Sequence, residues 1–323
     1  MTSRAELIDG IKKHQLYVTK QPGGRRMQLR NGNLSRIKMS KISLEDAVLP
    51  GANFIQATIR DVCFDFCDLF GTNFVEADLE GSSFVRADLR GANMARAKLR
   101  NANLKGADLR SGVMVVVDGG RERKVKRATD LANADMEGSM LSGANFAESN
   151  MSGSRLVDAD LSDANMFAVN LAGADLTGCN LSGAKLKNAN LKGARLKDSL
   201  LVGTDLTGAN LRNVDLAGID LSQANIANSI GSAKSVFQGA KFGGVAQLDG
   251  QGKKTGSVWR ADLSGTDFSK ADMRNAVFDA PKMKGASLKN ANISGVSFGD
   301  TDLGDVDLSG ANIGAILTGT IPE

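Results

Sequence analysis

Aromatic residues are scarce in this sequence: they make up 5% of the chain, with one tryptophan and one tyrosine. We therefore do not expect a core built on large rings. Proline is rare as well, with four residues, whereas glycine is abundant, with 37. Apolar residues still make up 42% of the 323 residues, so the chain can bury a core of Leu, Ala, Met and Phe side chains.

Residue types that carry catalysis or hold metals are few. The chain has one histidine, His14, and three cysteines whose spacing matches neither a disulfide framework nor a zinc site. A Ser-His-Asp triad, a multi-histidine metal site and a histidine general base are therefore poorly supported. Residues 250–255 resemble a phosphate-binding loop only in part, because the first glycine is missing at the required spacing. We expect no enzyme activity, no cofactor and no metal.

Long apolar runs are absent too. No stretch of about 18 apolar residues is available to span a membrane. The first residues contain no apolar segment followed by a small-residue cleavage site, so no secretory signal is predicted. Without a disulfide pattern, the reducing cytoplasm is the default compartment. We expect a cytoplasmic protein without membrane contact.

A repeat of five residues runs through most of the chain. Every fifth residue is Leu, Met, Phe or Ile over positions 29–114 and 131–226, at Phe237 and Phe242, and over positions 263–313. These registers contain 51 central positions, and none of them is polar. Chance does not produce such a pattern, so the repeat determines the fold.

The other positions of the repeat are restricted as well. A small residue, usually Ala, precedes the centre by two, Asp or Asn precedes it by one, and Gly often follows it by two. A period of five fits neither a helix nor a strand. It fits a coil with four short sides, in which the central and the small residue point inward. Glycine supplies unusual backbone angles at the corners.

This pattern closely resembles the pentapeptide-repeat family over about residues 28–314. The resemblance implies an all-β fold, a right-handed four-sided β-helix with twenty residues per coil. Residues twenty apart should then stack, with Phe54 on Phe74 and Phe64 on Phe84. A third column would consist of leucines only: Leu29, Leu49, Leu69, Leu89 and Leu109.

The same geometry assigns the cysteines and the histidine to packing roles. Cys67 and Cys179 stand at the small inward position and are predicted to be buried. Cys63 precedes its centre by one and is predicted to be exposed. His14 is predicted to have a role in the N-terminal cap or on the surface. The mixture of Asp and Asn before the centres is interpreted as relief of repulsion between stacked coils.

We divide the chain into three parts: a capping helix and arm over 1–27, one solenoid over 28–315 and a tail over 316–323. Apolar residues recur at helical spacing within residues 3–20. This arm is similar to one on other bacterial pentapeptide-repeat proteins. A helix there would cover the unpaired strand edges and apolar core of the solenoid end. Several family members dimerise through the C-terminal end, and a homodimer of this kind is a hypothesis here.

Two segments interrupt the register, at about 115–128 and 243–260. Each has Asp-Gly between β-forming residues and then a basic run, which indicates a hairpin. We predict two projecting hairpins, and a one-residue bulge near residues 229–232. Trp259 either packs on the solenoid or lies exposed as a binding hot spot. The candidate partner-binding residues are Arg121, Arg123, Lys124, Lys126, Arg127, Lys253, Lys254 and Trp259.

Charge is unevenly distributed around a net value of +4. Residues 1–41 carry ten basic and two acidic groups, and residues 118–127 carry five and two. Residues 45–80 carry one basic and eight acidic groups. The basic hairpins and acidic bands are either ordinary solvated faces or contact surfaces.

Three functions fit these features. The first is a non-enzymatic scaffold that presents a rigid solenoid and two basic loops to a protein partner. The second, implied by the resemblance, is DNA mimicry that modulates a type II topoisomerase such as gyrase, as in the quinolone-resistance members, whose rods are more acidic. The third, direct nucleic-acid binding through residues 121–127, ranks last because aromatic stacking partners are nearly absent. A family resemblance fixes a fold and not a partner.

Overall fold

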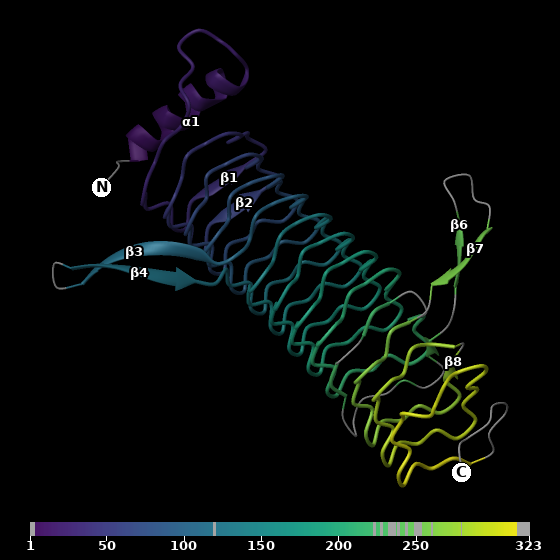
Figure 1. Cartoon of the computed structure of the whole chain (residues 1–323). Coiled ribbons are helices and arrows are strands. Elements are labelled where there is room, and N and C mark those ends of the chain that lie inside the picture. The colour runs from purple at the N-terminus through teal and green to yellow at the C-terminus, as the bar shows by residue number, and fades with distance from the viewer. Residues whose placement is uncertain are drawn as a thin grey trace. The chain divides into compact units, whose positions relative to one another are not determined.

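The structure is a computed structural model with two compact units, Met1–Asn170 (unit 1) and Leu171–Glu323 (unit 2). In each unit the chain winds in four-sided coils (Figure 1). The residues described are 4–118, 121–221, 224–226, 229–231, 237, 240–242, 245–248, 254–259, 261–278 and 280–314. The helix and strands are α1 (Arg4–Val18), β1 (Lys38–Ser40), β2 (Thr58–Arg60), β3 (Gly112–Asp118), β4 (Arg121–Arg127), β5 (Lys241–Phe242), β6 (Val245–Leu248), β7 (Lys254–Trp259) and β8 (Val277–Phe278).

Coils pair through parallel ladders with an offset of twenty residues. β1 pairs with β2 in this way, with Met39 opposite Ile59. Single bridges carry the same offset along the other sides. The main-chain N–H of Leu49 donates to the carbonyl of Asp68 at 2.8 Å, and equivalent bonds recur from coil to coil. Main-chain polar groups of one coil are thus satisfied by its neighbours, as in a parallel sheet.

Central side chains stack in columns inside the coils. The rings of Phe54 and Phe74 are 4.9 Å apart and 5° from parallel, and those of Phe64 and Phe84 are 5.0 Å apart and 9° from parallel. Neighbouring columns meet edge to face, with Phe54 and Phe64 6.1 Å apart. Both arrangements are favourable for aromatic pairs. The predicted stacking is therefore confirmed, and the leucine column is fully buried from the second coil onward: Leu49, Leu69, Leu89 and Leu109.

The corners explain the Asp, Asn and Gly positions of the repeat. The turn after Leu49 has Pro50 and then Gly51 at φ 67°, and the next N–H donates to the Leu49 carbonyl at 3.1 Å. This is a type II turn, which favours proline and then glycine at these positions. The Asp or Asn accepts a hydrogen bond from the N–H two residues on, as Asp68 does from Phe70 at 3.2 Å. These side chains therefore hold each strand-to-turn junction, a role beyond relief of repulsion.

Helix α1 covers the N-terminal end of unit 1, as predicted (Figure 1). His14 is fully buried in this cap, where its Nδ1 accepts a hydrogen bond from the N–H of Met27 at 3.0 Å and its ring stacks on Tyr17. Burial lowers the pKa of His14. Among the described residues, no helix is long and apolar enough to cross a membrane.

The first interruption begins earlier than predicted. Met114 was expected to be a central core residue, but it lies in β3, because the chain leaves the coil at Gly112. A Cβ at Gly112 would lie 2.8 Å from the Phe70 ring, so only glycine fits this exit. The pairing of coils resumes at Asp130, which bridges Asn93. These two residues are 37 positions apart, whereas paired residues of the preceding coils are twenty apart. A hairpin is thus inserted between two coils that remain paired.

Unit 2 repeats this arrangement. Phe242 stacks on Phe278 at 5.0 Å, and the antiparallel hairpin β6–β7 lies in the interruption before Leu263. The N–H of Gly231 donates to Asp267, 36 positions on, whereas that of Phe237 donates to a carbonyl 35 positions on. The offset of the hydrogen bonds thus falls by one from Gly231 to Phe237. Residues 232–236 lie outside the described part, so the bulge near 229–232 stays a prediction.

Candidate partner-binding surface

The β3–β4 hairpin presents two different faces. Its strands pair over seven residues each, and residues directly opposite one another point to the same face. The lysine face includes Val113, Val115, Lys124 and Lys126, with the acidic Glu122 toward the tip. The arginine face consists of Met114, Val116, Arg121, Arg123, Val125 and Arg127. Each face thus combines apolar and basic side chains.

Both faces are open to solvent. Val113 and Val115 are 58% and 57% exposed on the lysine face, and Val116 and Val125 are 41% and 40% exposed on the arginine face. The basic residues of β4 are exposed as well, except Arg127, which is half-buried at the base. A two-stranded ribbon is only marginally stable without packing. Its apolar side chains are therefore available to a partner.

Two glycines of unit 1 make room for the base of the hairpin: Gly112 itself and Gly71, where a Cβ would lie 2.8 Å from the Met114 Cε. Gly91 also lies beside the base, and a Cβ there would make an ordinary contact of 3.5 Å with the Arg127 carbonyl oxygen. The base of the hairpin thus lies directly against the corners of two coils.

Polar contacts fix the hairpin from the other side. Lys126 forms an ion pair with Glu148, and the Ser111 hydroxyl donates to the same carboxylate at 2.9 Å. The hydrogen bond from Lys126 and then that from Ser111 lower the pKa of Glu148. Lys126, a predicted partner-binding residue, therefore also anchors the hairpin.

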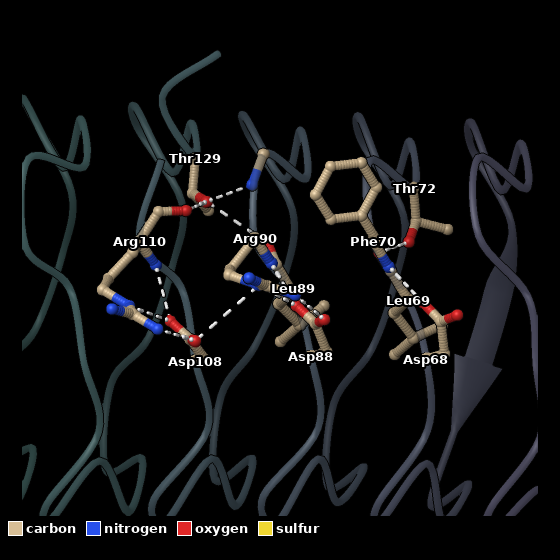
Figure 2. A network of polar contacts seen from close by, with 11 residues as sticks. Asp68, Leu69, Phe70, Thr72, Asp88, Leu89, Arg90, Asp108, Arg110 and Thr129 are labelled. Carbon is tan, nitrogen blue, oxygen red and sulfur yellow. Dashed lines mark hydrogen bonds and ion pairs between the residues drawn. The ribbon is translucent and has the colours of Figure 1, made fainter. Parts of the chain in front are cut away.

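Thr129 closes the gap that the hairpin leaves in the coils (Figure 2). Its buried hydroxyl donates to the Arg110 carbonyl at 2.8 Å and accepts a hydrogen bond from the N–H of Gly91 at 2.9 Å. Thr129, which follows the hairpin, is thus bonded to main-chain groups of two coils that precede it, and the Gly91 N–H also donates directly to the Arg110 carbonyl at 3.1 Å. Buried polar groups need such partners, so Thr129 stabilises the junction.

Two arginines line up beside this junction (Figure 2). Arg90 binds Asp88 with two hydrogen bonds of 2.9 and 2.7 Å, and Arg110 binds Asp108 with two of the same lengths. The Arg90 guanidinium also lies 5.7 Å from the centre of the Phe70 ring, a cation–π distance. Burial by itself raises the pKa of Asp108, but the hydrogen bonds from Arg110 outweigh it and the pKa is lowered.

A shallow groove continues the row of side chains. Where a large residue would follow Arg110 on the next coil, Ala147 leaves a space of about 310 Å³. The ring of Phe167, 40% exposed, forms its far wall. Sequence reasoning missed this groove, because the alignment of Arg110 with Ala147 depends on the offset of 37 across the hairpin. The groove is lined by Arg90, Arg110, Ser111, Ala147, Glu148 and Phe167.

The second hairpin contributes fewer described contacts. Lys254 begins β7, and Trp259 ends it opposite Val245. The side chains of Lys254 and Trp259 and the whole of Lys253 lie outside the described part of the chain. Whether Trp259 packs or binds thus stays a prediction.

The cysteines do not add a reactive or metal-binding site. Cys67 and Cys179 are buried, as predicted, and burial raises the pKa of the Cys67 thiol far above its ordinary value. Cys63 is half-buried, so its prediction as an exposed residue was wrong. Its neighbours on the same side of the coil, such as Asp65, cover part of it. No group of three or more His, Cys, Asp or Glu residues within the described ranges could hold a metal ion.

The comparison with protein families decides what kind of chain this is. A model described as pentapeptide repeats matches eight times, over more than half of the sequence. The matches cover residues 37–74, 72–110, 129–166, 164–201, 189–228, 260–295, 271–310 and 282–321. The chain belongs to the pentapeptide-repeat family. Its fold is therefore the right-handed β-helix of that family.

Solved structures similar to the chain include other pentapeptide-repeat proteins. HetL, which is involved in heterocyst differentiation regulation in the cyanobacterium Nostoc, is 24% identical, with 98% of this chain and 99% of that chain covered and a TM-score of 0.39. QnrB1, a plasmid-mediated fluoroquinolone resistance protein, is 17% identical, with 73% and 88% covered and a TM-score of 0.29. A thylakoid-lumen protein of Arabidopsis thaliana is 25% identical, with 38% and 83% covered and a TM-score of 0.16. No curated protein matches the sequence.

Proposed function

We propose that this pentapeptide-repeat protein is a non-enzymatic binding protein whose β3–β4 hairpin binds a protein partner with an acidic surface. One observation carries the proposal: a rigidly based hairpin exposes four large apolar side chains beside its basic residues. The partner would contribute carboxylates to the arginines and lysines and apolar area to the valines.

The composition of the hairpin supports a protein as partner. Arginine is enriched in protein interfaces, and apolar area supplies much of the affinity there. Basic groups at the rim steer an acidic partner and raise the rate of association, in a salt-dependent way. The anchored base lowers the cost of ordering the hairpin on binding.

The placement of the reactive side chains supports a non-enzymatic role. His14 is buried in the cap and accepts a main-chain hydrogen bond through Nδ1. Cys67 and Cys179 are buried in the core. Each of these side chains has a packing role, and none of them lies in the groove beside the hairpin.

Affinity capture with matched variants tests the proposal. The hairpin variant carries Arg121→Gln, Arg123→Gln and Lys124→Gln, which remove three charges far from the base. The control variant carries the same number of changes at exposed basic residues of the coils: Arg86→Gln, Lys98→Gln and Lys105→Gln. We expect the hairpin variant to lose partners that the wild type and the control retain, and direct titration of each identified partner to show weaker binding. An identical set of partners for all three proteins would overturn the proposal.

A second candidate is modulation of a type II topoisomerase through an acidic surface. Part of the acidic band of unit 1 is neutralised, since Arg60 pairs with Asp78 and Glu80. Five carboxylates of the band form no ion pair with any described residue: Glu45, Asp46, Asp61, Asp65 and Asp68. They are the observation that favours this candidate. A gyrase supercoiling assay with and without the protein tests it, and unchanged supercoiling and drug-stabilised cleavage would eliminate it.

A further inference from the structure

Helix α1 covers the N-terminal end of unit 1 only in part. Its hydrogen bonds reach the first coil at two places: His14 accepts from the N–H of Met27, and the Gln15 amide pairs with both main-chain groups of Ser43. The Gln15 side chain thereby replaces the strand of a preceding coil. The cap therefore satisfies the strand edge on one part of the coil.

The edge over residues 33–39 is open. In the second coil, the N–H of Asn53 donates to the Gly32 carbonyl and that of Thr58 to the Ile37 carbonyl, both at 2.8 Å. The equivalent N–H groups of the first coil belong to Asn33 and Lys38, and both residues are exposed. Neither N–H has a hydrogen-bond partner among the described residues. An unpaired edge of this kind is a template for an additional strand.

A cavity lined by apolar and polar residues lies between this edge and the first turns of α1. It has a volume of about 660 Å³. Met39 is only partly covered there, whereas Ile59, its neighbour in the same column, is fully buried, and Ile8 of α1 is 45% exposed. The apolar side chains that line the cavity are Leu7, Ile8, Ile11, Leu29, Leu34, Ile37 and Met39.

Charge indicates the chemistry of the occupant. Arg36 and Lys38 are exposed at the rim of the cavity. Residues 1–41 as a whole carry ten basic and two acidic groups. Two copies of this edge would therefore repel one another, whereas a segment with carboxylates would be attracted.

We propose that the open edge over residues 33–39 binds an extended segment of a partner protein in which apolar and acidic side chains alternate. The segment adds a strand to the first coil, and its main-chain carbonyls accept hydrogen bonds from the N–H groups of Asn33 and Lys38. Because side chains of a strand point to opposite faces in turn, its apolar residues enter the cavity while its carboxylates face Arg36 and Lys38. This site is separate from the β3–β4 hairpin, and neither proposal depends on the other.

A labelled peptide of four Val-Glu pairs, blocked at both ends, is the probe for this site. We expect saturable binding to the full-length protein by fluorescence anisotropy, and slower hydrogen exchange at the amides of Asn33 and Lys38 in the complex. A Val-Lys peptide of the same length serves as the charge control. A Val-Glu peptide with every second amide N-methylated serves as the backbone control. Neither control should bind.

Protein variants locate the peptide. The double variant Arg36→Glu and Lys38→Glu should bind it at least about tenfold more weakly, since both rim charges are reversed. The variant Lys38→Glu alone should give a smaller loss, which keeps the test valid if the double variant folds poorly. Arg86→Glu with Lys105→Glu, on the coils away from the edge, should bind like the wild type.

Three results would overturn this proposal. The first is equal affinity for the wild type and the rim variants, and the second is equal binding of the N-methylated peptide. The third is a stable dimer of the free protein in sedimentation that the rim variants abolish, which would assign the edge to a second copy of the chain. The hairpin variant with Arg121→Gln, Arg123→Gln and Lys124→Gln should retain the peptide, so failure here is distinguishable from failure of the proposed function.

Discussion

The coils of unit 1 bury their apolar side chains, whereas the β3–β4 hairpin exposes them. In the coils, central residues such as Phe74 and Leu89 are fully shielded from solvent. In the hairpin, Val113 and Val115 are more than half exposed. Both segments are β-structure of the same chain, but a coil inside the stack has a neighbour on each side, whereas the hairpin packs on the coils only at its base. The difference places stability in the coils and agrees with the proposal that the hairpin contacts a partner.

Truncation of a stacked ring in the coils should produce the largest loss of stability. Phe74→Ala removes a ring that touches Phe54, Phe64 and Phe84. We expect the free energy of unfolding to fall by about 3–5 kcal/mol. Denaturant titration followed by circular dichroism measures this loss. The matched hairpin variant Val115→Ala should change stability by less than about 0.5 kcal/mol, and a comparable loss there would contradict the comparison.

A substitution at the junction between coils and hairpin should have an intermediate effect on stability. Thr129→Val keeps the shape of the side chain but removes the hydroxyl that bonds both the Gly91 N–H and the Arg110 carbonyl, which then keep only their direct bond to each other at 3.1 Å. We expect a loss of about 0.5–1.5 kcal/mol in the free energy of unfolding. Thr129→Ser, which retains the hydroxyl, is the control. If the two variants were equally stable, the hydrogen bonds would not be what holds this junction.

The cap should respond to acid. The folded-state pKa of His14 lies below its unfolded value, because burial disfavours the charged ring. The unfolded cap therefore binds more protons, and the contribution of neutral His14 is complete above about pH 6.5 and is lost as the pH falls below that value. Helical circular dichroism of α1 between pH 8 and pH 5 measures the change. A His14→Gln variant should not show it, and a loss of helix that is identical in both proteins would exclude His14 as the cause.

The ion pair at the base of the hairpin should have the smallest effect on stability. Lys126 and Glu148 are both substantially exposed, so Glu148→Gln should lower the free energy of unfolding by less than about 1 kcal/mol. We expect instead that hydrogen exchange in β3 and β4 becomes faster while the coils remain unchanged. Exchange in the coils that accelerates equally would show that the hairpin and the coils unfold together.

Much of the fold could be predicted from the sequence, because the repeat encodes it locally. A central apolar residue every fifth position sets the coil, and the offset of twenty then places Phe54 on Phe74 without further information. The Asp-Gly signal likewise predicted both hairpins. The prediction that Met114 is a central core residue was wrong, since the five-residue pattern continues past Gly112, where the chain leaves the coil. At that point Gly112 lies against Phe70, two coils earlier, and the repeat pattern does not encode this contact.

The candidate site was less accessible to sequence reasoning. The basic residues of β4 were identified, but the exposed valines on both faces follow from the pairing register of the hairpin. The groove at Ala147 exists because a coil after the hairpin lies beside a coil before it. Which residues lie side by side there depends on how many residues the hairpin adds between paired coils. No short sequence motif gives that number.

The hairpin leaves and re-enters the solenoid at a single corner, where Gly112 faces Arg127 across the ribbon. The length of the segment between these two residues does not affect the pairing of the coils, because Asp130 pairs with Asn93 directly after it. The corner is thus a natural grafting point, at which a family could exchange one recognition element for another without redesigning the frame. Foreign loops of quite different length, closed by the same glycine exit and by Thr129, should be accepted there.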